Sequence, residues 1–221
     1  MEIFMNKCII VGAGECSIKK LQERLVVREG DLCIAADGGV EHLLQAGKTP
    51  HIVLGDMDSL KQYEIPATLP IQRLPVEKDD TDMLAAIKKG LTLGFRSFEF
   101  YGALGGRIDH TIANLQCLLY LMNRGARGVI IGNDTRILLM RNEKIMFPSN
   151  AYQKGQIISV FAFGQDAYGV SETGLKYTLD NVILQQEFPV GISNEFMGMD
   201  AAIEVKNGTL LLCIEDQRKD F

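Results

Sequence analysis

The sequence predicts an α/β domain with a mainly parallel sheet, followed by an all-β, sandwich-like domain. From residue 8 to about residue 141, apolar runs alternate with turns that carry Gly or Asp and with segments of helical period. This is the pattern of a parallel α/β sheet. After about residue 142, apolar and polar residues alternate with no helix pattern between the segments, as in β-domains. We therefore expect two domains, residues 1–142 and residues 143–221.

The first domain contains short apolar runs that we interpret as buried strands. They are residues 7–11, 32–36, 51–54, 71–74, 97–101 and 128–131. Two helices are well marked between these runs. Residues 80–91 carry an apolar stripe that includes Met83 and Ile87, and Asp79 or Asp80 is expected to cap the helix. The second helix is expected at residues 109–124, with Asp109 as its cap; its apolar stripe is Ile112, Leu115, Leu118, Leu119 and Met122.

The second domain is expected to consist of strands alone. They are residues 156–163, 174–179, 182–188, 201–205 and 209–214. Asn207 and Gly208 separate the last two, and this pair is typical of a type I′ turn, which needs positive φ at both positions. We therefore predict a hairpin there.

Composition and charge exclude several classes of function. The net charge is −5 and the 23 Lys and Arg residues are scattered, so no surface for nucleic acid is predicted. No stretch approaches the roughly 18 apolar residues of a membrane helix, and the first residues lack the features of a signal peptide. We expect a soluble, cytoplasmic protein. The five cysteines are widely spaced, which favours buried thiols over a zinc or redox site.

Acidic or glycine-rich clusters follow successive predicted strands of the first domain. They occupy residues 36–39, 55–59, 77–82 and 102–110. In an open parallel sheet the loops after the strands emerge at one edge, where ligands bind. The clusters should therefore converge on one crevice, which would gather the following carboxylates: Asp37, Asp56, Asp58, Asp79, Asp80, Asp82 and Asp109.

Carboxylates so close together repel one another unless a cation neutralises them. Oxygen ligands without His or Cys favour Mg²⁺, which commonly binds carboxylates together with substrate phosphates. Two glycine pairs, Gly38-Gly39 and Gly105-Gly106, allow backbone N–H groups to approach phosphate oxygens. Lys78 and Arg107 add positive charge within the acidic loops. The crevice is therefore predicted to bind a metal–polyphosphate.

Each cluster also has an ordinary structural interpretation. An Asp before a helix is most often only a cap, and Asp56-Met57-Asp58 alone is a common pattern. Gly12-Ala13-Gly14 follows the first strand, but Ser17 stands where a dinucleotide fingerprint has its third glycine, so no NAD site is predicted. The coincidence of the clusters at one sheet edge favours the functional interpretation.

In order and spacing, residues 55–59, 77–82 and 105–110 resemble the motifs of the thiamine pyrophosphokinase family, as do residues 174–179 and 193–195 of the second domain. The resemblance spans nearly the whole chain. It implies an N-terminal domain that binds ATP and Mg²⁺, a C-terminal β-sandwich, and a homodimer with thiamine sites between subunits. The implied reaction transfers a pyrophosphoryl group from ATP to the thiamine hydroxyl and yields thiamine diphosphate and AMP.

The resemblance also implies roles for individual residues. Mg²⁺ would be held by Asp56, Asp58 and Asp82. Arg107 would stabilise the transferred group with help from Lys78, and either Asp82 or Asp109 would accept the hydroxyl proton. The nucleotide side would comprise Asp37, Gly38, Gly39, Asp79, Thr81, Gly105, Gly106 and His110. Tyr177, Ser193 and Asn194 would hold thiamine.

Two positions match the bacterial form of the family, because Lys78 and Tyr177 stand where some eukaryotic members have Gln and Trp. Two other functions remain open on the residues alone. A metal-dependent nucleotide-sugar transferase would also use Asp56-Met57-Asp58 to hold a metal–diphosphate. A nucleotide-sensing binding module without turnover is the second alternative.

Overall fold

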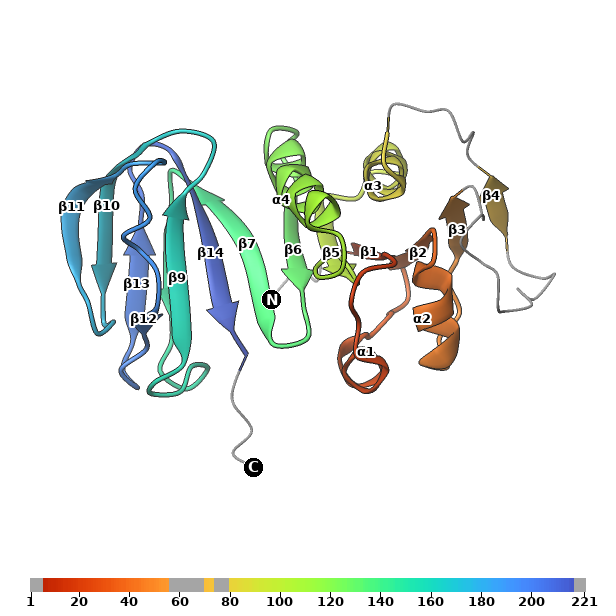
Figure 1. Cartoon of the computed structure of the whole chain (residues 1–221), viewed down its shortest axis with the longest axis horizontal. Helices are drawn as coiled ribbons and strands as arrows, with labels where there is room; N and C mark the ends of the chain where they lie inside the picture. Colours follow the sequence, from red (N-terminus) through yellow and green to blue (C-terminus); the bar gives the residue numbers. More distant parts are fainter. Residues whose placement is uncertain (1–5, 56–69, 74–79, 217–221) are drawn as a thin grey trace. The chain divides into compact units, whose positions relative to one another are not determined.

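The computed structural model describes residues 6–55, 70–73 and 80–216 (Figure 1). It divides into two compact units, one ending at Asn133 and the other beginning at Asp134.

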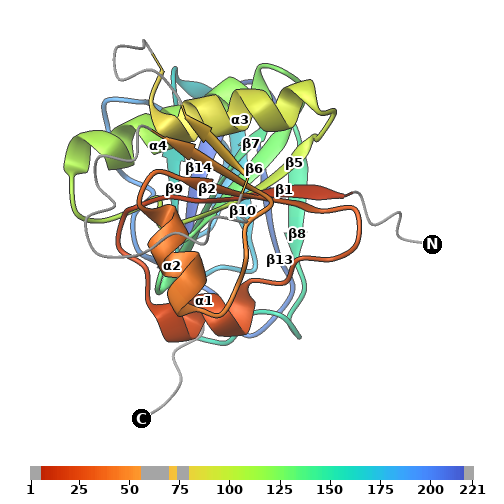
Figure 2. The same cartoon turned by 90° about the vertical axis from the view of Figure 1, so that its right-hand side faces the viewer.

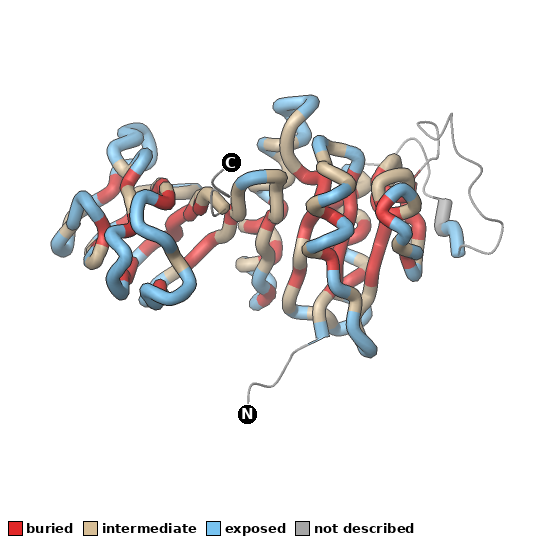
Figure 3. The backbone as a smooth tube through the Cα atoms, turned by 90° about the horizontal axis from the view of Figure 1, so that it is seen from below, coloured by how far each residue is buried: buried red, intermediate tan, exposed pale blue. Residues whose placement is uncertain are grey.

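The sheet of the first unit is parallel, in the order β6-β5-β1-β2-β3-β4. The strands are β1 Lys7–Val11, β2 Leu32–Ala36, β3 Ile52–Gly55, β4 Ile71–Arg73, β5 Ser97–Tyr101 and β6 Arg127–Ile131. Each lies within a residue of its predicted position at every described end. Their apolar runs form the buried interior of the unit, because both faces of the sheet are covered (Figure 3).

Helices cover the two faces of this sheet (Figure 2). The helices α1 Ile18–Arg24 and α2 Gly39–Gln45 lie on one face, and α3 Asp82–Thr92 and α4 Ile108–Met122 lie on the other. None of the helices in the described part of the chain is both long and apolar enough to cross a membrane. The five cysteines are free thiols, and burial raises the pKa of Cys33 to about 12.

The predicted cap of α3 is wrong, because Thr81 rather than Asp79 or Asp80 is the N-cap, directly before the first helical residue, Asp82. The Leu84 N–H donates to Thr81 Oγ1 at 3.2 Å. Asp80 instead accepts hydrogen bonds from Lys88 Nζ at 2.6 and 2.7 Å. The Thr81 hydroxyl therefore caps α3, and the Asp80 carboxylate binds Lys88 instead of capping the helix.

Two predictions for α4 are also corrected. Its N-cap is Arg107, without a side-chain cap, and Asp109 lies in the first turn. The buried face consists of Cys117, Leu118 and Leu121, whereas Ile112 is 53% exposed. Apolar residues surround much of this helix, so their period alone does not identify the face that packs on the sheet.

Within the described residues, the strands of the second unit form two groups whose pairings are antiparallel. The first has the order β12-β9-β14-β7, and the second has the order β11-β10-β13-β8. The bounds are β7 Thr135–Arg141, β8 Lys144–Phe147, β9 Ile157–Ala162, β10 Ala167–Thr173, β11 Leu179–Leu184, β12 Asn194–Glu195, β13 Ala201–Glu204 and β14 Thr209–Glu215. Side chains from both sheets share one core, including Ile158 and Leu212 from one and Val170 and Ile203 from the other. This arrangement is sandwich-like.

The predicted hairpin at Asn207-Gly208 is wrong. The strands on either side of it, β13 and β14, belong to different sheets and do not pair. Gly208 has a positive φ of 121°, but Asn207 does not have a positive φ, as a type I′ turn would need. Asn207 instead bridges to Tyr168 of β10. Burial of both sheets against one core therefore overrides the local turn preference.

The strand predicted at residues 174–179 is also absent, because this segment mainly connects β10 to β11. It begins at Gly174, whose φ is 71°, so the chain turns there rather than continuing as a strand. The prediction also missed β7, β8, β10 and β12, of which β8 has four residues and β12 has two.

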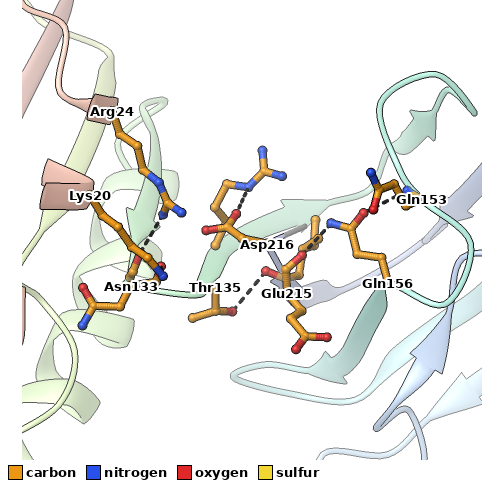
Figure 4. A network of polar contacts seen from close by, with 11 residues as sticks. Lys20, Arg24, Asn133, Thr135, Gln153, Gln156, Glu215 and Asp216 are labelled. Carbon is orange, nitrogen blue, oxygen red and sulfur yellow. Dashed lines mark hydrogen bonds and ion pairs between the residues drawn. The ribbon is translucent and has the colours of Figure 1, made fainter. Parts of the chain in front are cut away.

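Hydrogen bonds secure the end of each unit separately (Figure 4). In the first unit, Lys20 Nζ donates to the Asn133 carbonyl at 2.8 Å, and α1 also reaches this segment through Arg24. In the second unit, Arg136 Nε donates to Asp216 Oδ1 at 3.1 Å. These bonds fasten the last described residues of each unit to its own sheet or helix.

Candidate active site

The loops that follow β1 and β5 are joined by backbone hydrogen bonds. The Gly12 N–H donates to the Tyr101 carbonyl and the Gly14 N–H to the Gly102 carbonyl, both at 2.8 Å. Gly102 has φ of 57°, and a Cβ added there would lie 2.3 Å from the Gly12 carbonyl oxygen. Only glycine at position 102 allows the two loops to approach each other so closely. The two loops together form the floor of the site.

A pocket of about 570 Å³ opens above these loops, at the carboxyl edge of the sheet. Its lining includes the following residues that the sequence predicted for the site: Asp37, Thr81, Asp82, Gly105, Gly106, Arg107 and His110. They come from the loops after β2 and β5 and from the starts of α3 and α4. The predicted convergence of loops is therefore present for the residues that the structure describes.

Other predicted residues do not line this pocket. Gly38 is the N-cap of α2, and Asp109 lies on the first turn of α4. Gly39 packs against β1, since an added Cβ would lie 1.9 Å from the Val11 carbonyl oxygen. Close packing of helix on strand explains this glycine without a phosphate. Four further predicted residues lie outside the described part: Asp56, Asp58, Lys78 and Asp79.

The prediction missed the contribution of the loop after β1. Gly12, Ala13, Gly14 and Glu15 all line the pocket. Glu15 Oε1 accepts a hydrogen bond from the Gly106 N–H at 3.1 Å, so this carboxylate shapes the second glycine loop. The signal for this loop is Gly12-Ala13-Gly14 directly after a buried strand, a pattern that does not require a dinucleotide fingerprint to place a loop at the sheet edge.

Asp37, Thr81 and Asp82 bring polar groups into the pocket from two elements. Asp37 has φ of 49°, and its N–H donates to the Leu54 carbonyl at 2.7 Å, which fixes the turn after β2. Asp82 is the first residue of α3. The start of this helix therefore faces the pocket, and the positive end of its dipole favours an anionic ligand there.

Arg107 and Asp109 form an exposed bidentate ion pair. Arg107 Nη2 donates to Asp109 Oδ2 at 2.5 Å, and Nε donates to Oδ1 at 3.2 Å. The hydrogen bond with Arg107 lowers the pKa of Asp109, and the same contact raises the pKa of Arg107. Asp109 is therefore a weaker base than an ordinary aspartate, and its partner guanidinium is held in a defined orientation.

The donor atoms in this pocket suit a hard cation such as Mg²⁺. Asp37 and Asp82 supply carboxylate oxygens, and neither cysteine nor a cluster of histidines lines the pocket. Among residues 6–55, 70–73 and 80–216, no group of three or more His, Cys, Asp or Glu side chains is arranged to hold a metal. Two of the predicted ligands, Asp56 and Asp58, lie outside these ranges.

The second unit contains a separate pocket of about 270 Å³. Its lining is Glu172, Tyr177, Leu179, Val190, Gly191, Ile192 and Asn194. The Tyr177 side chain is 60% exposed at this pocket. Ser193 does not line it, but has φ of 58° and donates its N–H to Ser159 Oγ at 3.0 Å. The structure therefore brings Tyr177 and Asn194 together, with Ser193 beside them in sequence.

Comparison with known proteins identifies relatives along both units. Residues 24–130 match the family model "Thiamin pyrophosphokinase, catalytic domain", and residues 142–212 match "Thiamin pyrophosphokinase, vitamin B1 binding domain". The thiamine pyrophosphokinase of Bacillus subtilis is 31% identical over 193 residues, covering 83% of this chain and 87% of that protein. The thiamin pyrophosphokinase 1 of Caenorhabditis elegans is 26% identical, covering 73% and 70%.

Solved structures share the fold. The crystal structure of thiamine pyrophosphokinase from Bacillus subtilis superposes with a TM-score of 0.84 at 23% identity, covering 96% of this chain and all of the other (100%). The structure of thiamin pyrophosphokinase from Geobacillus thermodenitrificans gives a TM-score of 0.78, also at 23% identity, covering 97% and 100%.

These findings first define a class: the protein is a transferase with a pyrophosphokinase catalytic domain followed by a vitamin-binding domain. More particularly, the chain belongs to the thiamin pyrophosphokinase family, and its function is that of a thiamine pyrophosphokinase.

Proposed function

We propose that this enzyme transfers a pyrophosphoryl group from ATP to the hydroxyl of thiamine, in a Mg²⁺-dependent reaction that yields thiamine diphosphate and AMP. The observation that carries the proposal is the pocket of the first unit, where carboxylates, a glycine loop and the start of α3 meet. In this proposal, residues 1–142 bind the nucleotide and Mg²⁺, and residues 143–221 bind thiamine.

The nucleotide phosphates would lie along the pocket that includes Asp37, Thr81, Gly105, Gly106 and His110. The N–H groups at the start of α3 favour anions, and the glycine loop adds further backbone donors. The proposed nucleotide site also keeps Gly38, Gly39 and Asp79. Gly38 and Gly39 would contribute to this site indirectly, by holding the start of α2 in place beside the pocket.

Asp56, Asp58 and Asp82 would hold Mg²⁺. When bound there, the ion supplies positive charge that offsets the charge of the phosphates and carboxylates. The protein side chains orient the substrates around this charge, which matters because phosphoryl transfer depends mainly on positioning and electrostatic stabilisation. Lys78 would contribute a further positive charge.

Arg107 would stabilise charge that develops on the transferred group. Asp109 holds the Arg107 guanidinium through two hydrogen bonds, and its lowered pKa makes it a poor proton acceptor. This favours Asp82, which lines the pocket, as the acceptor of the thiamine hydroxyl proton. We therefore propose that Asp109 is a positioning residue.

On the thiamine side, Tyr177 would pack its exposed ring against the vitamin, with Ser193 alongside. The Asn194 side chain makes its hydrogen bonds within the protein, so its proposed role is to shape the pocket.

We further propose a cytoplasmic homodimer with thiamine sites between subunits, for which exposed apolar residues such as Ile108 supply surface. A monomeric mass by light scattering with both substrates present would contradict the dimer.

Replacing Asp82 tests the catalytic pocket. We expect Asp82→Asn to lower kcat by about 10²-fold or more and to weaken the response to Mg²⁺, since it removes a charge that faces the phosphates. The matched control is Asp80→Asn, two residues away, whose carboxylate binds Lys88 and does not line the pocket. Equal losses in the two variants, measured as AMP release, would contradict the assignment.

The same assay separates the alternatives left open by the residues. A nucleotide-sugar transferase would release a nucleoside diphosphate, and a sensing module would bind ATP without releasing AMP. The vitamin-binding match over residues 142–212 has no place in either alternative and supports the pyrophosphokinase reaction.

A further inference from the structure

A buried carboxyl group in the second unit has an unused oxygen atom. Glu172 of β10 is only 2% exposed. Its Oε2 accepts a hydrogen bond from Asn194 Nδ2 at 2.8 Å, whereas Oε1 has no hydrogen-bond partner among the described residues. Burial raises the pKa of this carboxyl, and the bond from Asn194 only partly opposes that effect. Such a group is costly to keep in a protein interior without a ligand.

Asn194 cannot supply further hydrogen bonds to a ligand. Its amide protons bind Glu172 Oε2 and the Tyr177 carbonyl, and its Oδ1 accepts from the N–H groups of Tyr177 and Glu195. These bonds use both donors and both acceptor positions of the side chain. Asn194 therefore fixes the orientation of Glu172 and of the segment that carries Tyr177.

Glu172 lines the pocket of about 270 Å³ in the second unit. Apolar side chains of Leu179, Val190 and Ile192 form much of the wall, and Tyr177 lines it as well. The pocket thus combines apolar and aromatic surface with a buried, oriented carboxyl group, Glu172, of which one oxygen has no hydrogen-bond partner among the described residues. That combination is typical of a site that orients a small aromatic ligand by one hydrogen bond.

We propose that Glu172 is a specificity-determining residue for thiamine, with Oε1 accepting a hydrogen bond from the exocyclic amino group of the pyrimidine ring. The proposal rests on the proposed function. Thiamine has two conventional hydrogen-bond donors, this amino group and the hydroxyl. The hydroxyl must reach the nucleotide phosphates, and the thiazolium ring carries charge but no N–H. The amino group is therefore the donor that remains for Glu172.

Glu172→Gln is the decisive variant because it keeps the size of the side chain. Asn194 would still donate to the amide oxygen, which places the amide nitrogen where Oε1 was and changes an acceptor into a donor. Kinetics are measured with thiamine and with oxythiamine, which has a carbonyl in place of the amino group. We expect the KM for thiamine to rise about tenfold or more, with kcat within about twofold, because a buried polar contact is lost.

The preference for thiamine over oxythiamine should fall by about tenfold or more in Glu172→Gln, since the new donor matches the carbonyl. A purely structural role would weaken both substrates equally. Glu187→Gln, the same change at an exposed position that does not line the pocket, is the control. An unchanged preference in a Glu172→Gln protein with wild-type urea stability would overturn the proposal, as would an equal change in Glu187→Gln.

Failure of the proposed function gives a different result. If the wild-type protein forms no thiamine diphosphate, the reaction assignment is wrong, and calorimetric binding of thiamine and oxythiamine to wild type and Glu172→Gln still tests the role of Glu172. Selective binding that depends on Glu172 supports the inference, and binding that ignores the substitution overturns it.

Discussion

At the scale of single residues, the ion pair between Arg107 and Asp109 holds the guanidinium through two hydrogen bonds and makes the carboxylate a weaker base. Their position after β5 predicts that both lie near the site, because the topology of a parallel sheet determines where that segment emerges; Arg107 lines the pocket and Asp109 does not. Their pairing was not predictable, since Asp109 could equally have capped α4. The hydrogen bonds between the two side chains decide this point and lower the pKa of Asp109.

Substitution at these two positions should separate positioning from proton transfer. We expect Arg107→Lys to lower kcat by about 10²-fold, because lysine cannot reproduce the two-point contact with carboxylate or phosphate. Asp109→Asn should cost less, since the guanidinium remains in place. Steady-state assays with Arg124→Lys as control, just beyond the C-terminal end of α4 and away from the pocket, check both expectations. A greater loss in Asp109→Asn than in Arg107→Lys would instead indicate that Asp109 is the base.

At the scale of elements, buried strands were predicted well and exposed or mixed ones poorly. In the first unit, β1, β2 and β3 are short runs buried almost throughout, so composition alone marks them. In the second unit, Asn207-Gly208 carries a strong local turn signal, yet the chain passes there from one sheet to the other. Which strands share a sheet depends on contacts distant in sequence, and no local pattern contains that information.

The contact between α2 and β1 provides a stability test at this scale. Gly39→Ala would place a Cβ 1.9 Å from the Val11 carbonyl oxygen. We expect a loss of about 1–3 kcal/mol in the free energy of unfolding, as for other overpacked positions. The control is Gly38→Ala, at a φ of −58° that alanine adopts without strain. Urea unfolding measures both variants, and equal stabilities would contradict the packing role of Gly39.

At the scale of the whole molecule, the order of an α/β unit and a β-unit followed from the change in sequence periodicity. The crevice in the first unit followed from topology and charge, and its described part contains Asp37, Asp82 and Arg107 as predicted. Thiamine could not be derived in this way. It came from resemblance, and the family matches over residues 24–130 and 142–212 support it. The unused oxygen of Glu172 adds a physical reason for selectivity that periodicity cannot reveal.

The most direct test of pyrophosphoryl transfer follows both products by phosphorus NMR, with ATP, thiamine and Mg²⁺ as the only substrates and cofactor. The account predicts AMP and thiamine diphosphate in equal amounts, and neither product when Mg²⁺ is removed with a chelator. Formation of ADP with thiamine monophosphate, or of AMP with free pyrophosphate and unchanged thiamine, would contradict it.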